Sequence, residues 1–308
     1  MSFCILNSEA VQLHFLVIYK SNINMKIGKY KLNIITSGYF GLDGGAMFGV
    51  VPKPLWQKTN PSDERNRIKL SATHLILESG NRKIIIDTGM GNKVDEKFRQ
   101  IYDVDESHTM DKGLSKIGLK RDDITDVFLT HLHFDHTGGS TIIENGKIVP
   151  AFPNAKYYVQ KKQYDWAVNP SDKDKASYIK DNYVPLLQEG VLNFTSGDEQ
   201  FDDEIRFIET SGHTFGQQLI KLSDSSNTIL FCADLIPTAS HIPLPYIMGY
   251  DLQPMETLKE KANILPLAAE ENWKLFFGHD PEFAFCSIMH TEKGIKADKK
   301  YKSFDELS

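Results

Sequence analysis

The sequence predicts an α+β fold in which two β-sheets are covered by helices. Its 308 residues are 41% hydrophobic, which is enough to form one large core. Apolar, strand-like runs are mixed with helical segments before Gly190, and the pattern returns more briefly after it. No internal repeat and no long linker divides the chain, so we expect a single domain over residues 25–308.

The first half begins with a segment that alternates apolar and polar residues from Met25 to Ile35, as an opening strand does. Residues 124–130 are mostly apolar and β-branched, which is typical of a buried strand. The elements expected in this half are strands at 31–37, 68–78 and 82–87, helices at 94–102 and 110–117, strands at 124–130 and 156–159, and helices at 162–169 and 175–188.

The second half is shorter and richer in strands. Its expected elements are strands at 191–195, 204–209, 217–222 and 228–233, a helix at 255–269 and a last strand at 273–277.

The first 24 residues fit this scheme poorly. Their apolar run at 11–19 is too short to span a bilayer, and it lacks a basic leader and a cleavage site of small residues. Since Met25 opens the first strand, we interpret residues 1–24 as an N-terminal extension or a mis-assigned start.

Charge and cysteine content exclude several classes of partner. The net charge is −6, and the one lysine-rich stretch, at 296–302, is interpreted as a solvated terminus, so we expect neither a nucleic-acid nor a membrane partner. The three cysteines, Cys4, Cys232 and Cys286, are scattered and imply no disulfide framework. A reducing compartment, and hence a cytoplasmic location, is expected.

A cluster of metal-binding residue types follows the strand at 124–130. His131, His133, Asp135 and His136 stand where this strand ends and a loop begins. Imidazole and carboxylate are ligands that zinc accepts, and a catalytic zinc keeps one position open for water. Four ligands are too many for one such ion, and side-chain alternation lets the loop serve two adjacent ions.

The remaining ligands are expected further along the chain. His213 lies in a turn flanked by glycines, Asp234 ends the apolar run 228–234, and His279 follows the last strand. Each residue would be unremarkable alone, but their order and their positions at strand ends favour a shared site.

This set of residues resembles the metallo-β-lactamase superfamily, whose pattern is HxHxDH, a GHTxG-type histidine, a bridging aspartate and a last histidine. The resemblance covers about residues 25–289 and implies a four-layer αββα sandwich with the metals where its halves meet. It also implies a ligand set: His131, His133 and His213 for a first zinc, Asp135, His136 and His279 for a second, and Asp234 as the bridge. Asp87, in the run 84–89, matches a family aspartate that orients ligands.

The resemblance implies hydrolysis by two Zn²⁺ ions. A hydroxide that bridges them is available near neutral pH and would attack a carbonyl or a phosphorus. Asp135 is the candidate catalytic residue because it can also move a proton. Flavo-diiron relatives carry a glutamate at the position of His133, so zinc is favoured, although cobalt, manganese or iron can substitute.

The substrate prediction depends on residues 39–56, which are rich in glycine, aromatic and aliphatic residues. The stretch resembles a loop of the quorum-quenching N-acyl-homoserine lactonases and of the organophosphate-hydrolysing branch that includes methyl parathion hydrolase. There it lines a hydrophobic groove and can cross a dimer interface, which leaves a homodimer open. Met47, Phe48 and Phe134 are therefore the candidates for an acyl-chain wall.

One departure from the lactonases concerns the residues after Asp234. The best-known members carry a tyrosine there that contacts the lactone, whereas this chain offers only Thr238 or His241 as substitutes. We therefore expect a small-molecule lactone or ester as substrate and a lactonase as the function. The alternative is a phosphotriester, ester or thioester hydrolase with the same metals. A metal-binding sensor that had lost catalysis would lack a ligand, and none is missing.

Overall fold

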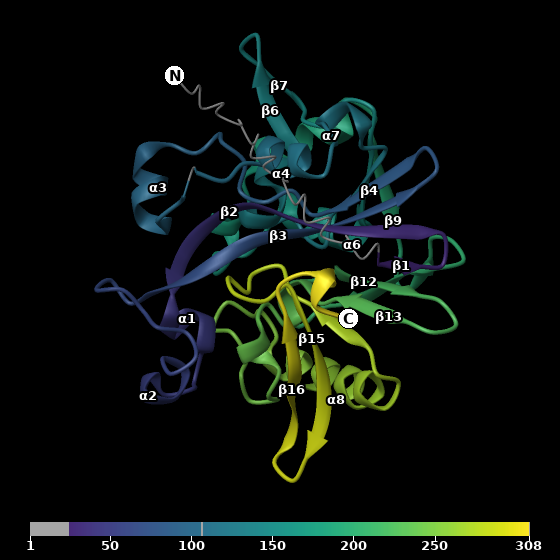
Figure 1. Cartoon of the computed structure of the whole chain (residues 1–308). Helices are drawn as coiled ribbons and strands as arrows, with labels where there is room; N and C mark the ends of the chain where they lie inside the picture. The colour runs from purple at the N-terminus through teal and green to yellow at the C-terminus, as the bar shows by residue number, and fades with distance from the viewer. Residues whose placement is uncertain (1–24, 106, 308) are drawn as a thin grey trace, which may run out of the picture.

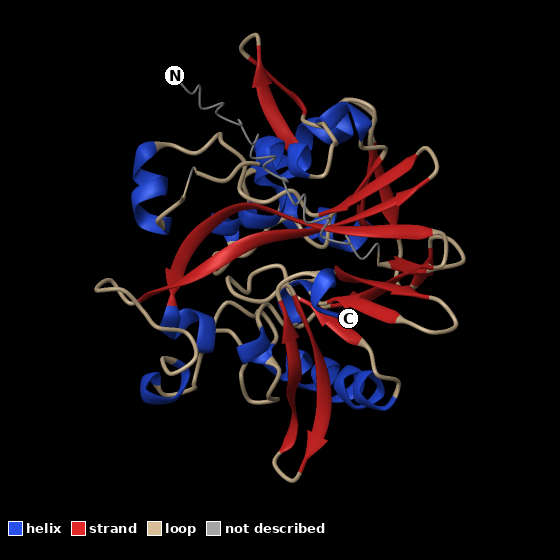
Figure 2. Cartoon of the chain, viewed as in Figure 1, coloured by secondary structure: helices blue, strands red, loops and turns tan. Residues whose placement is uncertain are grey.

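Two seven-stranded sheets pack face to face in the computed structural model, which describes residues 25–105 and 107–307 (Figures 1 and 2). The first sheet contains, in spatial order, β1 (Lys26–Ile27), β2 (Tyr30–Asp43), β3 (Arg67–Ser79), β4 (Arg82–Ile86), β5 (Asp126–Phe128), β8 (Lys156–Gln160) and β9 (Leu192–Thr195). The second contains β10 (Glu199–Gln200), β11 (Ile205–Thr210), β12 (Gln217–Ser223), β13 (Thr228–Phe231), β14 (Lys274–Phe276), β15 (Phe285–Thr291) and β16 (Gly294–Tyr301). The interpretation of residues 1–24 concerns a segment outside the described residues.

Helices cover the outer faces of both sheets. Figure 1 shows α4 (Met110–Lys116), α6 (Lys161–Val168) and α7 (Val184–Gln188) on the first sheet and α8 (Pro254–Glu270) beyond the second. The smaller helices are α1 (Gly44–Phe48), α2 (Lys53–Trp56), α3 (Glu96–Tyr102) and α5 (Phe134–Thr137), and β6 (Thr141–Glu144) pairs with β7 (Lys147–Pro150). Within the described residues, no helix is both long enough and apolar enough to cross a bilayer.

Alternation along the strands builds a core on each side of the first sheet. Leu75 and Leu77 of β3 pack between the sheets, whereas Ile76 packs against the outer helices. In β4, Ile84 and Ile86 point inward and Ile85 outward, as the period of two requires. The order is therefore helix, sheet, sheet, helix, and the expected αββα sandwich is confirmed.

Parallel pairing places the candidate ligands at one edge of the sandwich. In the first sheet β4 and β5 are parallel, and in the second sheet β13 and β14 are parallel. Asp87 follows β4, the histidine cluster follows β5, Asp234 follows β13 and His279 follows β14. The carboxyl ends of parallel strands lie at the same edge, so residues far apart in the sequence meet there.

Two expectations about the elements are wrong. The helix expected at 175–188 is two 3₁₀ turns followed by α7, and Pro185, which has no amide hydrogen to donate, lies in the first turn of α7. The last strand was expected at 273–277, yet the lysine-rich stretch 296–302 is largely strand β16, which pairs with β15; its lysines are exposed to solvent, as expected. Lysines suit an edge strand because they keep its open side in water.

Candidate metal centre

Unusual backbone conformations help to orient the carboxylates of Asp87 and Asp234 toward the site. Asp87 has φ 58°, and Ala233, which precedes Asp234, has φ 44°. Non-glycine residues adopt such conformations at a cost of about 1–3 kcal/mol each, so they occur mainly where the surrounding structure enforces them. Here they turn the chain sharply just after β4 and β13.

Close backbone packing explains the two glycines that follow the histidine cluster. A Cβ atom on Gly138 would lie 1.9 Å from the carbonyl oxygen of Met90, and one on Gly139 would lie 2.2 Å from that of Thr88. Neither position has room for a side chain. The metal loop is thus fixed against the segment after β4, where Thr88 Oγ1 also donates to the carbonyl of His136 at 2.9 Å.

Three imidazoles form the first group of candidate ligands. His131 Nε2 and His213 Nε2 each lie 3.1 Å from His133 Nδ1. The second group contains Asp135, His136 and His279, with 2.9 Å between the Nε2 atoms of the two histidines and 3.6 Å from His279 Nε2 to Asp135 Oδ2. Within each group the ligand atoms lie within 4.8 Å of one another.

Asp234 lies between the two groups. Its Oδ1 is 3.2 Å from His279 Nε2, and its Oδ2 is 3.4 Å from His213 Nε2. One oxygen therefore faces each group, as the position of a bridging ligand requires.

The hydrogen bonds of the ring nitrogens that face away from the cluster show which nitrogens are left to bind a ligand. His279 Nδ1 donates to the carbonyl oxygen of Ser71 at 2.8 Å, and His136 Nδ1 donates to Asp87 Oδ2 at 2.9 Å. A neutral ring that donates from Nδ1 has a lone pair on Nε2, yet these two Nε2 atoms face each other. A positive charge between them, from a metal ion or from a proton on His136, accounts for this arrangement. A metal ion also accounts for Asp234 Oδ1, which is buried with no hydrogen-bond partner among the described residues. The residues therefore fit a metal site.

The electrostatics agree with a site for cations. Burial and the neighbouring imidazoles lower the pKa of His131 and His133 well below the usual 6.5, which leaves both rings neutral. Burial opposes charge on His136 as well, but Asp234 and the other carboxylates outweigh it and raise the pKa of His136 well above that value. Burial also opposes ionisation of Asp234, yet the surrounding imidazoles hold its pKa well below 3.8. The carboxylates thus favour positive charge in a dry pocket.

Hydrogen bonds behind the ligands fix their orientation. Asp87 accepts from the amide of Thr130 at 2.7 Å, in addition to its bond with His136. Asp251 accepts from His213 Nδ1 at 2.9 Å and from Thr257 Oγ1 of α8 at 2.7 Å. Carboxylates that bind the far nitrogen of a ligating histidine set its tautomer. The sequence offered no signal for Asp251, because it lies in an irregular segment 38 residues after His213.

Replacing Asp251 by Asn is expected to lower both metal affinity and activity by about 10–100-fold, because the Nδ1 proton of His213 loses its charged acceptor. Metal titration followed by competition with a chelator measures the affinity. Asp224→Asn, which changes a carboxylate in a turn remote from the cluster, is the matched control. Equal affinities in the two variants would show that Asp251 does not orient His213.

Glu260 of α8 makes the loop before His213 sensitive to pH. Its carboxylate accepts from the amide of Ser211 at 2.6 Å, and burial raises its pKa from 4.5 to about 6. A carboxyl whose pKa is higher in the folded state stabilises the fold below its unfolded pKa, and this contribution is lost as the pH rises through the folded pKa. Between about pH 4.5 and pH 6 the ionising carboxylate therefore becomes a cost.

We expect Glu260→Gln to raise the free energy of unfolding by about 1 kcal/mol at pH 7.5 and by much less at pH 4.5, since the amide keeps an acceptor but cannot ionise. Urea unfolding at the two pH values measures this difference. A gain of equal size at both pH values would contradict the assignment.

A pocket of about 180 Å³ opens onto the cluster. Five of the seven candidate ligands line it, and its apolar wall contains Leu42, Met47, Phe134 and Met248. Met47 and Phe134, two of the residues expected to form a hydrophobic wall, thus line this pocket.

Two expected wall residues lie behind the pocket. Phe48 is fully buried and stacks on the ring of His241 at 4.5 Å. His241 Nε2 donates to the carbonyl of Met47 at 2.8 Å, its Nδ1 accepts from Thr238 Oγ1 at 2.8 Å, and burial lowers its pKa to about 4. The expectation that Phe48 and His241 face the substrate is corrected by this geometry, because both support the backbone that carries Met47.

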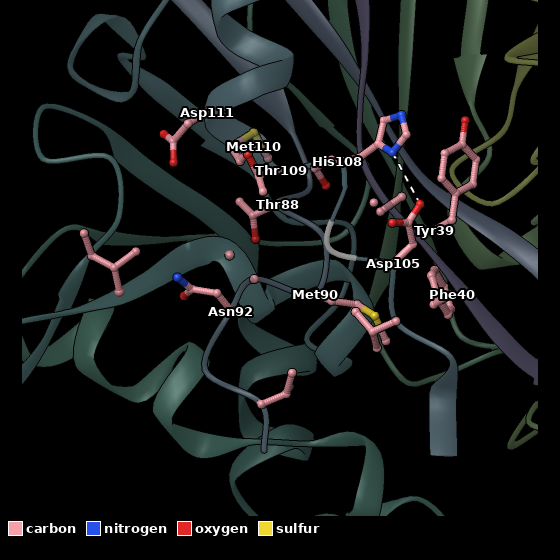
Figure 3. Close-up of a pocket in the computed structure, with 18 of the residues that line it drawn as sticks. Tyr39, Phe40, Thr88, Met90, Asn92, Asp105, His108, Thr109, Met110 and Asp111 are labelled. Carbon is pink, nitrogen blue, oxygen red and sulfur yellow. Dashed lines mark ion pairs between the residues drawn. The ribbon is translucent and has the colours of Figure 1, made fainter. Parts of the chain in front are cut away.

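A second cavity, of about 340 Å³, contains none of the candidate ligands (Figure 3). Tyr39, Met90 and His108 are among its lining residues, and Asp105 lies 3.4 Å from His108 Nδ1. Phe40 lines it as well and packs edge-on against the ring of His279 at 5.4 Å. This cavity is larger than the pocket at the cluster, but no candidate ligand lines it, so we do not assign the reaction to it.

Known proteins share this fold and this sequence pattern. The model of the family described as Metallo-beta-lactamase superfamily matches residues 70–279. An N-acyl homoserine lactonase of Bacillus cereus is 26% identical over 253 residues, which are 77% of this chain and 88% of that protein.

Solved structures of other proteins superpose on this fold. A probable metal-dependent hydrolase from Staphylococcus aureus superposes with a TM-score of 0.82 at 29% identity, covering 90% of this chain and 98% of that one. AidC, a dizinc quorum-quenching lactonase in complex with a product, superposes with a TM-score of 0.73 at 22% identity, covering 89% of this chain and 95% of that one, which shows a similarity of fold.

Proposed function

The chain belongs to the metallo-beta-lactamase superfamily of metal-dependent hydrolases, and we propose that it is a dinuclear zinc enzyme that opens lactone rings. The observation that carries the proposal is the pair of ligand groups joined by Asp234. The lactonase activity named for its relative from Bacillus cereus supports the choice of substrate.

The proposal assigns the ligand atoms by their positions. His131 Nε2, His133 Nδ1 and His213 Nε2 would hold the first ion. Asp135 Oδ2, His136 Nε2 and His279 Nε2 would hold the second, with one oxygen of Asp234 on each. When bound, two zinc ions would supply a hydroxide nucleophile near neutral pH and would polarise the carbonyl of the substrate.

The protein groups perform the remaining steps. Asp135 lines the pocket and takes the proton that the nucleophile loses, then gives it to the ring oxygen as the C–O bond of the lactone breaks. Leu42, Met47, Phe134 and Met248 hold an alkyl chain and keep water away from it. The product is the ring-opened hydroxy acid, with one water added in total.

Two further expectations stay predictions. The cytoplasmic location depends on the scattered cysteines, of which Cys232 and Cys286 are free and buried. The homodimer depends on residues 39–56, where Val50 is 92% exposed and Leu55 is 50% exposed.

A substrate panel tests the proposed function. We expect zinc- or cobalt-loaded protein to open N-acyl-homoserine lactones and to leave paraoxon, a β-lactam and a glutathione thioester nearly untouched, with no turnover by His131→Ala. If paraoxon or the thioester is turned over and every lactone is left intact, the alternative ester or phosphotriester hydrolase replaces the lactonase.

A further inference from the structure

Two tyrosines that belong to neither ligand group line the pocket above the cluster. Tyr102 is the last residue of α3, and Tyr250 lies in the segment between the 3₁₀ turn at 239–241 and α8. Tyr102 comes from a part of the chain far from Asp234, whereas Tyr250 lies in the segment that follows Asp234, beyond His241.

The two tyrosine hydroxyls are free to bind a ligand. Across residues 25–105 and 107–307, neither hydroxyl has a hydrogen-bond partner in the protein, and neither is among the buried polar atoms without a partner. Lys173 also lines the pocket, but its Nζ donates to the carbonyls of Gly249, Tyr250 and Asp251 at 3.1, 3.0 and 2.9 Å, which uses its three hydrogens. The phenols therefore remain as donors for a substrate.

Both phenols keep their protons at neutral pH. Burial and the nearby Asp135 carboxylate raise the pKa of Tyr102 above the usual 10, and burial, Tyr102 and the carboxylates of Asp43 and Asp135 do the same for Tyr250. A protonated phenol donates a hydrogen bond to a carbonyl oxygen.

Ring contacts hold the side chain of Tyr102, and hydrogen bonds hold the backbone that carries Tyr250. The ring of Tyr102 lies 4.4 Å from that of Phe98 and 5.0 Å from that of Phe134, which belongs to the apolar wall. The backbone of Tyr250 is tied down by Lys173 and by the bond from the amide of Gly249 to the carbonyl of Ala46 at 2.7 Å. Donors on such fixed segments lose little freedom when a ligand binds.

The phenols stand beside the apolar wall, so a second polar group of the substrate is their natural partner. The reacting carbonyl must lie at the ligand atoms, which are imidazole nitrogens and carboxylate oxygens. A lactone that carries an acyl chain through an amide has a second carbonyl a few bonds from the ring, between the ring and the chain. That carbonyl accepts hydrogen bonds, whereas a plain alkyl lactone has nothing at this point.

We propose that the hydroxyls of Tyr102 and Tyr250 donate to the amide carbonyl of an N-acylated lactone and select such lactones over plain alkyl lactones. This inference rests on the proposed lactonase function. It assigns substrate selection to residues that take no part in holding the metals.

The test compares two substrates, N-hexanoyl-homoserine lactone and γ-decalactone, in Tyr102→Phe and Tyr250→Phe. We expect each variant to lower kcat/KM for the acylated lactone about fivefold to tenfold and the double variant more, with γ-decalactone changed less than twofold. Tyr39→Phe, which removes a phenol from the other cavity (Figure 3), is the matched control and should change neither substrate.

Binding of the ring-opened product gives a second readout that needs no turnover. Calorimetry should show weaker binding of N-hexanoyl-homoserine to both variants by a similar factor, and unchanged binding to Tyr39→Phe. Equal losses on the two lactones, or no loss on either, would overturn the inference while leaving the lactonase intact. Wild-type protein that opens neither lactone would overturn the proposed function, and the inference with it.

Discussion

Replacing Asp234 by Asn is expected to lower kcat for lactone opening by on the order of 10³-fold, because one side chain faces both ligand groups. The amide keeps the volume but removes the negative charge that the buried imidazoles of His136, His213 and His279 surround. The NH₂ group of the new asparagine would also face the ring nitrogens whose lone pairs would otherwise bind a metal ion. Kinetics at saturating lactone, together with metal analysis of the purified variant, measures the effect.

The control for Asp234→Asn is Asp165→Asn, which alters an exposed carboxylate of α6 paired with Lys161. It should retain full activity and full metal content. An Asp234→Asn enzyme within tenfold of wild type would show that the two groups work without a bridge.

Removal of metal is expected to lower the melting temperature by about 10 °C, because ions bound only by the folded state add on the order of 4 kcal/mol at concentrations far above Kd. The protein alone pairs these ligand atoms poorly, because the Nε2 atoms of His136 and His279 lie 2.9 Å apart and Asp234 Oδ1 has no hydrogen-bond partner in the part of the chain that the structure describes. Thermal unfolding followed by circular dichroism, before and after dialysis against a chelator, measures the shift, and added zinc should restore it.

His131→Ala and His290→Ala separate specific from general effects of zinc. The first removes a candidate ligand and should lose most of the shift, whereas the second changes an exposed histidine of β15 and should keep all of it. A wild-type melting temperature that is the same with and without metal would contradict a metal centre inside the fold.

The order of the candidate ligands could be predicted because each follows an apolar strand or, like His213, lies in a turn flanked by glycines. A buried strand such as 124–130 ends in the protein interior. Polar residues directly after it therefore need a binding partner there, such as a metal ion. The same argument works for Asp234 after β13 and His279 after β14. The sheet order that brings these strand ends together is not visible in any local pattern.

The groups that orient ligands and contact substrate were harder to predict. Asp251 and Tyr250 lie in an irregular segment, where no period indicates which side chains turn inward. His241 and Phe48 were misassigned because aromatic residues near a metal loop fit both a pocket wall and the layer behind it. Only the contacts of the folded chain, such as the bond from His241 to the carbonyl of Met47, decide between these roles.

The broken helix at 175–188 has a similar cause. Its residues have reasonable helix propensity, but Pro185 favours a first-turn position and tertiary contacts override propensity. The hairpin of β15 and β16 was missed because β16 carries several lysines and little apolar alternation.

The most direct test of a two-ion hydrolytic centre is the initial rate of N-hexanoyl-homoserine lactone opening as zinc is added to metal-free protein. The rate should depend on zinc and level off at two equivalents per chain, in keeping with the two ligand groups joined by Asp234. Full activity in metal-free protein, or a plateau at one equivalent, would contradict the account.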